Sequence, residues 1–399
     1  MSRVAADAAP PVLVFMWEQF SAYHIDRLDA LGVAYGDRAR VVGIEVASRS
    51  RTYAWDPIEG AAHYERHTLF PDQVADDIGW RRKFKASRSL LRALRPAAVF
   101  LCNQEQPEIL ALLALLRLRG VRTYAMLDAK FDDTPRRVAK EWLKPAVFRL
   151  FTGGLVSGDR SADYYRFLGL PGGWSQPGYD TVSVARVRAL VGGRVAPEGA
   201  PHAARDFVSV ARFVPKKNLV CAIQAYAAWR AMRPAHPRRL VLCGSGPLEA
   251  MLRDECARLG VTDGVIFPGF LGPEEVARQL ADGLAFVLPS VEEQWGLVVN
   301  EAVALGLPIL CSDNVGARDT LVRVGQNGFV FEPHNPDGLA GLMFLVSEDE
   351  RLWRRFCHGS QRLALAGDVV MFVAGVEALT GVPVPDPQWA LPQTLKSPA

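Results

Sequence analysis

The chain has 399 residues, and its hydrophobic content of 49% is enough to bury two cores of ordinary domain size. A formal net charge of +3 argues against a nucleic-acid-binding surface, which needs concentrated basic charge. The six cysteines are scattered and form no Cys-x2-Cys pair, so we expect reduced thiols in a cytoplasmic protein and neither a disulfide framework nor a zinc site.

The first half of the chain alternates short apolar runs with longer amphipathic stretches. The apolar runs cover residues 12–16, 41–46, 98–102, 121–127 and 154–157. This alternation predicts an α/β domain with a parallel sheet, which we place in residues 1–190. Residues 191–205 are rich in Gly, Pro and Ala without periodicity, and we expect them to be a linker.

One segment of the first half is strongly basic. Residues 80–95 contain seven Lys or Arg and no acidic residue, with Phe84, Leu90, Leu91 and Leu94 between them. Two interpretations stay open, a solvated outer face of a helix or a peripheral contact with an anionic membrane. A membrane-spanning helix is not expected, because the longest apolar helix-like stretch stops at Arg117.

The second half repeats the alternation from Phe207 onward. Its predicted strands are residues 207–211, 240–243, 265–267, 285–288 and 309–312. We expect a second α/β domain in residues 206–366. In such sheets ligands bind beyond the carboxyl ends of the strands, so the loops that follow these runs are candidate binding loops.

Two glutamates, Glu293 and Glu301, have seven residues between them and follow the apolar run 284–288. Residues 297–305 have the pattern of a helix with one apolar face, which places Glu293 in a strand-to-helix loop. Glu301 then lies one to two turns into the helix and within reach of a ligand at its N-terminus.

The start of this predicted helix offers backbone N–H groups that have no partner within the helix. They belong to Trp295, Gly296 and Leu297. A phosphate binds readily at such a helix N-terminus. One segment could therefore hold a sugar, a diphosphate and a ribose.

Five further motifs lie within about 125 residues around this segment. They are Val208-Ser-Val-Ala-Arg212-Phe-Val-Pro-Lys-Lys217-Asn218, Leu240-Val-Leu-Cys-Gly244-Ser-Gly246-Pro247, Val265-Ile-Phe-Pro-Gly269-Phe270, Ala302-Val-Ala-Leu-Gly306-Leu-Pro308-Ile309 and Asn327-Gly328-Phe-Val-Phe-Glu-Pro333. Taken alone, the first is typical of a surface loop and the second of a turn. Together with Glu293 and Glu301, the set resembles retaining glycosyltransferases of family 4.

This resemblance implies the GT-B fold, in which two Rossmann-like domains face a central cleft. It also implies a C-terminal segment, residues 367–399, with a helix at 371–379 that crosses back to the first domain and an irregular tail. The donor would be a nucleotide sugar acting as co-substrate, with no other cofactor and no metal ion.

The resemblance implies roles for individual residues. Arg212, Lys217 and Glu293 would be catalytic, the two cations by neutralising the departing diphosphate. Glu301 would accept hydrogen bonds from the ribose hydroxyls. The remaining donor-binding residues would be Gly244, Gly246, Phe270, Trp295, Gly296 and Leu297. No Asp-x-Asp sequence is present to hold a divalent ion between phosphates.

The first domain matches the family less well. Its later strand ends at Leu127-Asp128-Ala-Lys130, without the histidine that the family often has there. We take His24, Lys130 and Asp132 as candidates for the acceptor side, although a lone histidine at a helix start is often structural. The acceptor stays open among a glycan, a lipid carrier and a small metabolite.

The sequence thus predicts a retaining hexosyltransferase, with a UDP-sugar favoured over a GDP-sugar. Two alternatives remain, a nucleotide-sugar epimerase of related fold and a non-catalytic sugar-nucleotide-binding protein. We expect a cytoplasmic location, with a peripheral membrane contact as an option.

Overall fold

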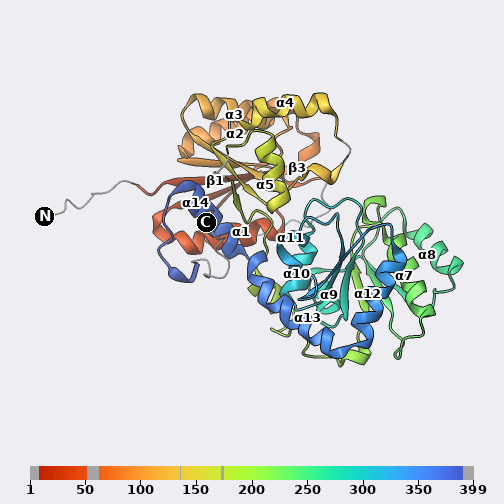
Figure 1. Ribbon diagram of the computed structural model, residues 1–399. Helices are drawn as coiled ribbons and strands as arrows, with labels where there is room; N and C mark the ends of the chain where they lie inside the picture. The colour runs from red at the N-terminus through yellow and green to blue at the C-terminus, as the bar shows by residue number, and fades with distance from the viewer. Residues whose placement is uncertain (1–8, 52–62, 135, 172–174, 390–399) are drawn as a thin grey trace.

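The computed structural model describes residues 9–51, 63–134, 136–171 and 175–389, and in them the chain forms two α/β domains (Figure 1). The first domain holds a seven-stranded sheet in the order β3-β2-β1-β4-β5-β6-β7, and every strand pair in it is parallel. Its strands are β1 (Val12–Trp17), β2 (Arg40–Arg49), β3 (Glu65–Val74), β4 (Ala98–Leu101), β5 (Arg122–Leu127), β6 (Gly153–Val156) and β7 (Ser175–Pro177). Its helices are α1 (Ala22–Tyr35), α2 (Trp80–Leu94), α3 (Pro107–Leu118), α4 (Val138–Phe148) and α5 (Asp159–Phe167).

The second domain follows the short helix α6 (Val184–Ala189) and is also built on a parallel sheet, in the order β10-β9-β8-β11-β12-β13. Its strands are β8 (Phe207–Val210), β9 (Leu240–Cys243), β10 (Val265–Gly269), β11 (Ala285–Leu288), β12 (Ile309–Ser312) and β13 (Gly328–Phe331). Its helices are α7 (Leu219–Ala231), α8 (Glu249–Arg258), α9 (Pro273–Ala281), α10 (Leu297–Ala304), α11 (Arg318–Leu321), α12 (Pro336–Glu348) and α13 (Glu350–Leu363). The predicted α/β fold with two Rossmann-like domains is confirmed.

Both faces of each sheet are buried, which is why the strands have nearly continuous apolar sequences. In β1, Leu13 and Phe15 enter one hydrophobic core, and Val14 and Met16 enter another on the opposite face. This is the alternation that a strand imposes on successive side chains. The predicted apolar runs form strands for this reason.

Three strands are not predicted by the apolar runs. The edge strand β3 is rich in polar residues and contains Pro71, so it lacks the apolar run of a central strand. The short β7 has only three residues, and β13 coincides with part of a motif rather than with a predicted strand. Edge positions tolerate these sequences because one side of such a strand has no ladder partner.

The last helix, α14 (Val369–Thr380), lies against the first domain, where its blue ribbon runs beside α1 and β1 in Figure 1. Its N-cap, Asp368, accepts hydrogen bonds from the backbone N–H groups of Val370 and Val184. The ring of Phe372 packs 5.8 Å from that of Phe15 in the first core. The C-terminal part of the chain therefore ties the two domains together.

The basic segment forms α2, and its apolar side faces inward. Leu91 and Leu94 are buried in the core, with Phe84 and Leu90 packed against it. Lys83 is also buried and lies 3.4 Å from Glu108. Because these apolar side chains are held by the core, α2 presents mainly basic groups at the surface.

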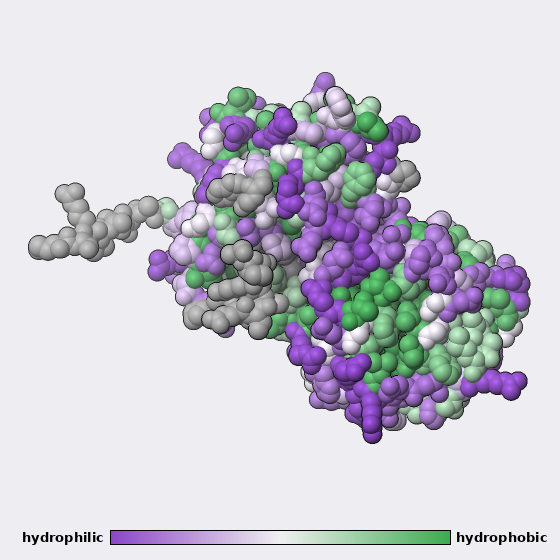
Figure 2. Space-filling model, in the orientation of Figure 1, coloured by the Kyte–Doolittle hydropathy of each residue, from purple (hydrophilic) through white to green (hydrophobic). Residues whose placement is uncertain are grey.

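No helix in the described part of the chain is long and apolar enough to cross a membrane. On the surface, hydrophilic residues gather at the junction of the two domains, and a wide hydrophobic area covers the second domain between α9 and α12 (Figure 2).

Candidate active site

The candidate residues of the second domain lie where the strand order reverses. In its sheet β8 pairs with β9 on one side and with β11 on the other. A crevice forms at such a switch point, beyond the carboxyl ends of the strands. Arg212 and Lys217 follow β8, and Glu293 follows β11, so the fold brings the three predicted catalytic residues to neighbouring strand ends.

Lys217 and Glu293 form an ion pair between their ammonium and carboxylate groups. Both side chains are mostly buried, with 13% and 12% of their surfaces exposed. The Ser290 hydroxyl also donates to Glu293, at 3.1 Å. Arg212, by contrast, is exposed. The loop after β8 thus supplies two cations, Lys217, which is held by its ion pair, and Arg212, which is exposed.

Backbone contacts hold the Glu293 loop against the segment that follows β12. The Gly316 N–H donates to the Glu293 carbonyl at 3.2 Å, and the Ala317 N–H donates to the Trp295 carbonyl at 3.0 Å. A Cβ atom at Gly316 would lie 1.8 Å from the Gln294 carbonyl oxygen. Only glycine fits there, so the position of Glu293 depends on this close approach.

The glycine loop after β9 packs against the Arg212 loop. Gly244 has a φ of +139°, and a Cβ atom on it would lie 2.0 Å from the Ala211 carbonyl oxygen. Gly246 makes a similar approach, since a Cβ atom on it would lie 2.6 Å from the Phe213 carbonyl oxygen. Phe270, after β10, is 72% exposed. These residues lie at three adjacent strand ends.

Trp295 and Gly296 shape the start of α10. Gly296 has a φ of +99° and directly precedes Leu297, the first helical residue. The Trp295 indole is buried, donates to the Asn300 side chain at 2.8 Å, and would be 3.0 Å from a Cβ atom at Gly158 of the first domain. The Trp295 ring therefore packs between the two domains, so a ligand could contact only the backbone of this residue.

Glu301 lies at the junction of the domains. The Tyr23 hydroxyl of α1 donates to its carboxylate at 3.1 Å. Burial raises the pKa of Glu301, and the Tyr23 hydrogen bond and the Arg186 charge act in the opposite direction. The predicted ribose-binding carboxylate is thus bonded to the other domain.

A cavity of about 410 Å³, here called the junction cavity, opens beside this contact. Its walls come from the strand ends of the first domain, including the switch point between β1 and β4, and from the start of the α10 segment. Its lining includes His24, Arg27, Glu105, Asp128, Ala129, Tyr165 and Asp180 of the first domain, and Gln294 and Leu297 of the second. Residues of both domains therefore face one space.

His24 lines the junction cavity but is held by its neighbours. Its ring stacks on Trp17 with 4.6 Å between centroids, and its Nδ1 accepts from the Ser21 N–H at 3.1 Å. Burial and the nearby Arg27 charge hold the pKa of His24 well below its ordinary value. The imidazole is therefore neutral near pH 7.

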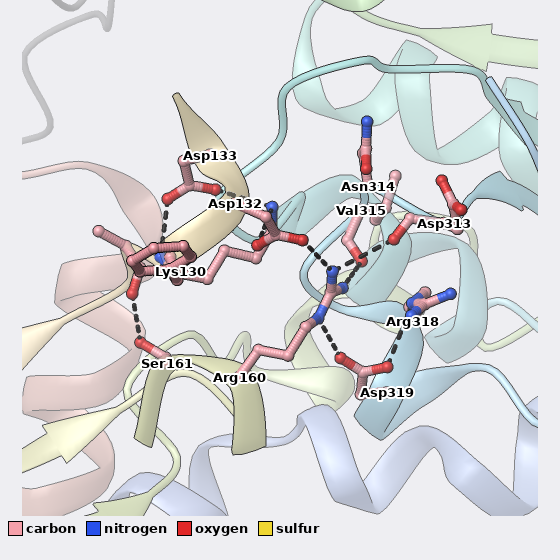
Figure 3. A network of polar contacts seen from close by, with 12 residues as sticks. Lys130, Asp132, Asp133, Arg160, Ser161, Asp313, Asn314, Val315, Arg318 and Asp319 are labelled. Atoms are coloured by element: carbon pink, nitrogen blue, oxygen red, sulfur yellow. Dashed lines mark hydrogen bonds and ion pairs between the residues drawn. The ribbon is translucent and has the colours of Figure 1, made fainter. Parts of the chain in front are cut away.

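Lys130 and Asp132 do not line the junction cavity and belong to a separate network (Figure 3). Lys130 is buried, and its ammonium lies 2.8 Å from Asp133 and 3.2 Å from Asp132. Asp132 also pairs with Arg160 at 3.1 Å. The structure thus separates these two acceptor candidates from His24.

Arg160 connects this network to the second domain. Its guanidinium pairs with Asp319 and donates to the carbonyl oxygens of Asp313 and Val315 (Figure 3). Val315 and Gly316 contact the Glu293 loop, so Arg160 links the first domain to the segment that supports Glu293. A single arginine in a helix carries no sequence signal of such a role.

Asp128 was not selected from the sequence, although it directly follows the apolar run of β5. It lines the junction cavity together with Asp180. Burial and the negative charge of Asp180 raise the pKa of Asp128 to about 7. The position of Asp128 at the end of a predicted strand was the sequence feature that could have identified it.

Within the described ranges, no group of three or more His, Cys, Asp or Glu side chains could hold a metal ion.

Residues 195–361 match the sequence model of the family described as glycosyl transferases group 1. An uncharacterised glycosyltransferase of Methanocaldococcus jannaschii is 36% identical over 105 residues, which are 26% of this chain and 27% of that protein. A D-inositol 3-phosphate glycosyltransferase of Acidothermus cellulolyticus is 28% identical over 240 residues, 57% of this chain and 52% of that one. The chain therefore matches about a quarter to a half of the length of these relatives.

Solved structures extend the likeness to nearly the whole chain. The lipopolysaccharide outer core galactosyltransferase WaaB has a TM-score of 0.68 at 15% identity, covering 93% of this chain and 99% of that one. The Anabaena protein HepE, solved in complex with UDP-glucose, has a TM-score of 0.65 at 17% identity, with coverage of 93% and 99%. The chain therefore has the GT-B fold, and its segment 195–361 is similar to the group 1 glycosyl transferases.

Proposed function

We propose that the protein is a retaining glycosyltransferase that transfers a hexose from a nucleotide sugar to a hydroxyl acceptor. The observation that carries this proposal is the meeting of Arg212, Lys217 and Glu293 at one switch point, with Glu301 on the helix that follows. The similarity of residues 195–361 to group 1 glycosyl transferases supports it.

The proposed reaction breaks the bond between the sugar C1 and the diphosphate oxygen and forms a bond from C1 to the acceptor oxygen on the same face. Negative charge then grows on the departing diphosphate. Arg212 and Lys217 would stabilise it, with the N–H groups at the start of α10. The acceptor proton would leave with the diphosphate.

In this proposal Glu293 orients the donor sugar and Glu301 holds the ribose. A carboxylate suits two neighbouring hydroxyl groups because its two oxygens accept two hydrogen bonds. The cations are side chains, so we propose that no metal ion is required. A UDP-sugar is favoured over a GDP-sugar, and the likeness to HepE, which was solved with UDP-glucose, is in keeping with this choice.

The acceptor would enter through the junction cavity, which both domains line. The cavity supports a transferase over an epimerase, because an epimerase needs no second substrate. The presence of Arg212, Lys217, Glu293 and Glu301 together likewise favours an enzyme over a non-catalytic binding protein. All six cysteines are buried and unpaired, which supports the proposed cytoplasmic location.

A donor and acceptor array tests the proposal. The purified protein would be incubated with UDP- and GDP-hexoses and hydroxyl acceptors in excess EDTA, with release of nucleoside diphosphate as the first readout. NMR of the product would give the anomeric configuration. Transfer with retention is expected; an inverted product, or activity that requires added magnesium or manganese, would contradict the mechanism.

A further inference from the structure

Helix α4 places apolar side chains outward and a carboxylate inward. Val138, Trp142 and Leu143 are 74%, 84% and 73% exposed. Glu141 is buried, and it accepts hydrogen bonds from Lys144 at 2.7 Å and from Tyr164 at 2.8 Å. A helix on a water-facing surface has the opposite arrangement. The exposed trio, here called the α4 surface, therefore needs a partner other than water.

More apolar rings lie nearby. Phe131 and Phe167 are 56% and 67% exposed and pack edge to face at 6.3 Å. Phe131 also contacts Tyr164, which bonds to Lys144 of α4. Hydrophobic residues reach the surface of the first domain where Figure 1 places α3 and α4 (Figure 2).

Basic side chains flank the α4 surface. Arg137 and Lys140 are exposed, and neither has an ion-pair partner among the residues that the structure describes. Apolar side chains that include a tryptophan, bordered by free cations, are typical of helices that lie in the interface of an anionic bilayer.

A groove of about 440 Å³ between α3 and α4 continues from this surface. Its apolar lining includes Leu110, Leu143, Val147, Phe148 and Leu168, and its basic lining is Arg136, Lys140 and Lys144. Glu105, Ala129 and Tyr165 line both this groove and the junction cavity. A chain lying in the groove would therefore end beside the junction cavity, through which the acceptor is proposed to enter.

We propose that the α4 surface docks on an anionic lipid membrane and that the α3–α4 groove receives the hydrocarbon chain of a lipid-linked acceptor. The membrane docking is inferred from the exposed residues alone. That the bound hydrocarbon chain belongs to the acceptor rests on the proposed function. The basic pattern of α2 also allows a membrane contact, but Phe84, Leu90, Leu91 and Leu94 of that helix are taken up by the core, and only Trp80 at its start is an exposed apolar side chain.

Vesicle sedimentation tests the docking with the full chain. The protein should bind phosphatidylcholine vesicles that contain phosphatidylglycerol, and bind less at high salt. Trp142→Ser with Leu143→Ser should lower the bound fraction by about tenfold or more, since both side chains would leave the bilayer. The control, Trp80→Ser with Val324→Ser, removes two other exposed apolar side chains and should bind like the parent.

Three results would overturn the docking. In the first, the parent stays in the supernatant. In the second, the control variant loses vesicle binding as much as the α4 variant does. In the third, the parent binds no vesicles but is a dimer, and the α4 variant is a monomer. The last would make this face an interface between copies, and sedimentation velocity would reveal it. Thermal melts would confirm that both variants fold.

Binding of alkyl phosphates tests the groove without measuring transfer. Dodecyl phosphate, below its micelle concentration, should bind at least about tenfold more tightly than butyl phosphate because of the longer apolar chain. Leu143→Ser should reduce that difference. Equal affinities would remove the chain site, while failure of glycosyl transfer in the donor array would leave both results unaffected.

Discussion

The Tyr23 hydroxyl of the first domain donates a hydrogen bond to Glu301 of the second, across 278 positions of sequence. Glu301 is the carboxylate proposed to hold the ribose, so a bound donor nucleotide would compete with Tyr23 for this carboxylate. The contact would then couple donor binding to the junction of the domains.

Replacing Tyr23 with Phe should therefore strengthen binding of UDP. Removing a competing hydrogen bond of ordinary strength, about 0.5–1.5 kcal/mol, corresponds to a gain of roughly two- to tenfold in affinity. Calorimetry of the variant and the parent would measure it. A weaker affinity in the variant would show that Tyr23 assists the nucleotide instead.

Arg160 supports the Glu293 loop from the first domain, and its loss should loosen that loop. Arg160→Ala removes the hydrogen bonds that the guanidinium donates to Asp319 and to the Val315 carbonyl. We therefore expect the free energy of unfolding to fall by about 1–3 kcal/mol. Hydrogen exchange in residues 313–319 should also become faster. The control Arg253→Ala removes an exposed pair with Glu249 and should cost at most about 0.5 kcal/mol. Equal effects of the two variants would exclude a special role for Arg160.

The raised pKa of Asp128 predicts a pH-dependent effect on stability. The carboxyl has a pKa of about 7 in the folded protein and an ordinary value of 3.8. Between these values the folded protein holds a proton that the unfolded chain has released, so stability falls as the pH rises from about 4 to about 7.

Asp128→Asn removes this ionisation. Its melting temperature should exceed that of the parent at pH 8, where the parent must keep a buried charge, and the difference should shrink at pH 5. The exposed Asp254→Asn serves as the control and should show no such trend. A gain that is equal at both pH values would reject the assigned pKa.

Arg212→Ala and Lys217→Ala should lower kcat more than they raise KM for the donor, because their charges matter most when the diphosphate departs. Steady-state kinetics with the donor found in the array would measure both constants. If kcat stays within twofold of the parent in both variants, neither residue belongs to the mechanism.

Local patterns were sufficient for much of the fold. The buried runs of β1, β4, β9 and β11 are apolar because both faces of a central parallel strand meet a core, and turns and helices follow them in order. Because β8 and β11 are neighbours in the sheet, Arg212 and Glu293 then follow adjacent strand ends. The edge strand β3 lacks that constraint, which is why its polar sequence gave no signal.

Contacts between the domains could not be predicted in this way. The partners of Tyr23 and Arg160 lie far away in the sequence, and tertiary packing alone decides them. The same holds for α4, whose sequence is amphipathic but does not reveal that Glu141 faces the protein and Trp142 the solvent.

The most direct test of the account is calorimetric titration of UDP and GDP into the parent and Glu301→Ala, both in excess EDTA. The account predicts that the parent binds UDP and that the variant, which should still fold, binds it more weakly by about 1–3 kcal/mol, because the ribose hydroxyls lose their acceptor. The account would be contradicted if the two proteins bound UDP with equal affinity, or if the parent bound neither UDP nor GDP.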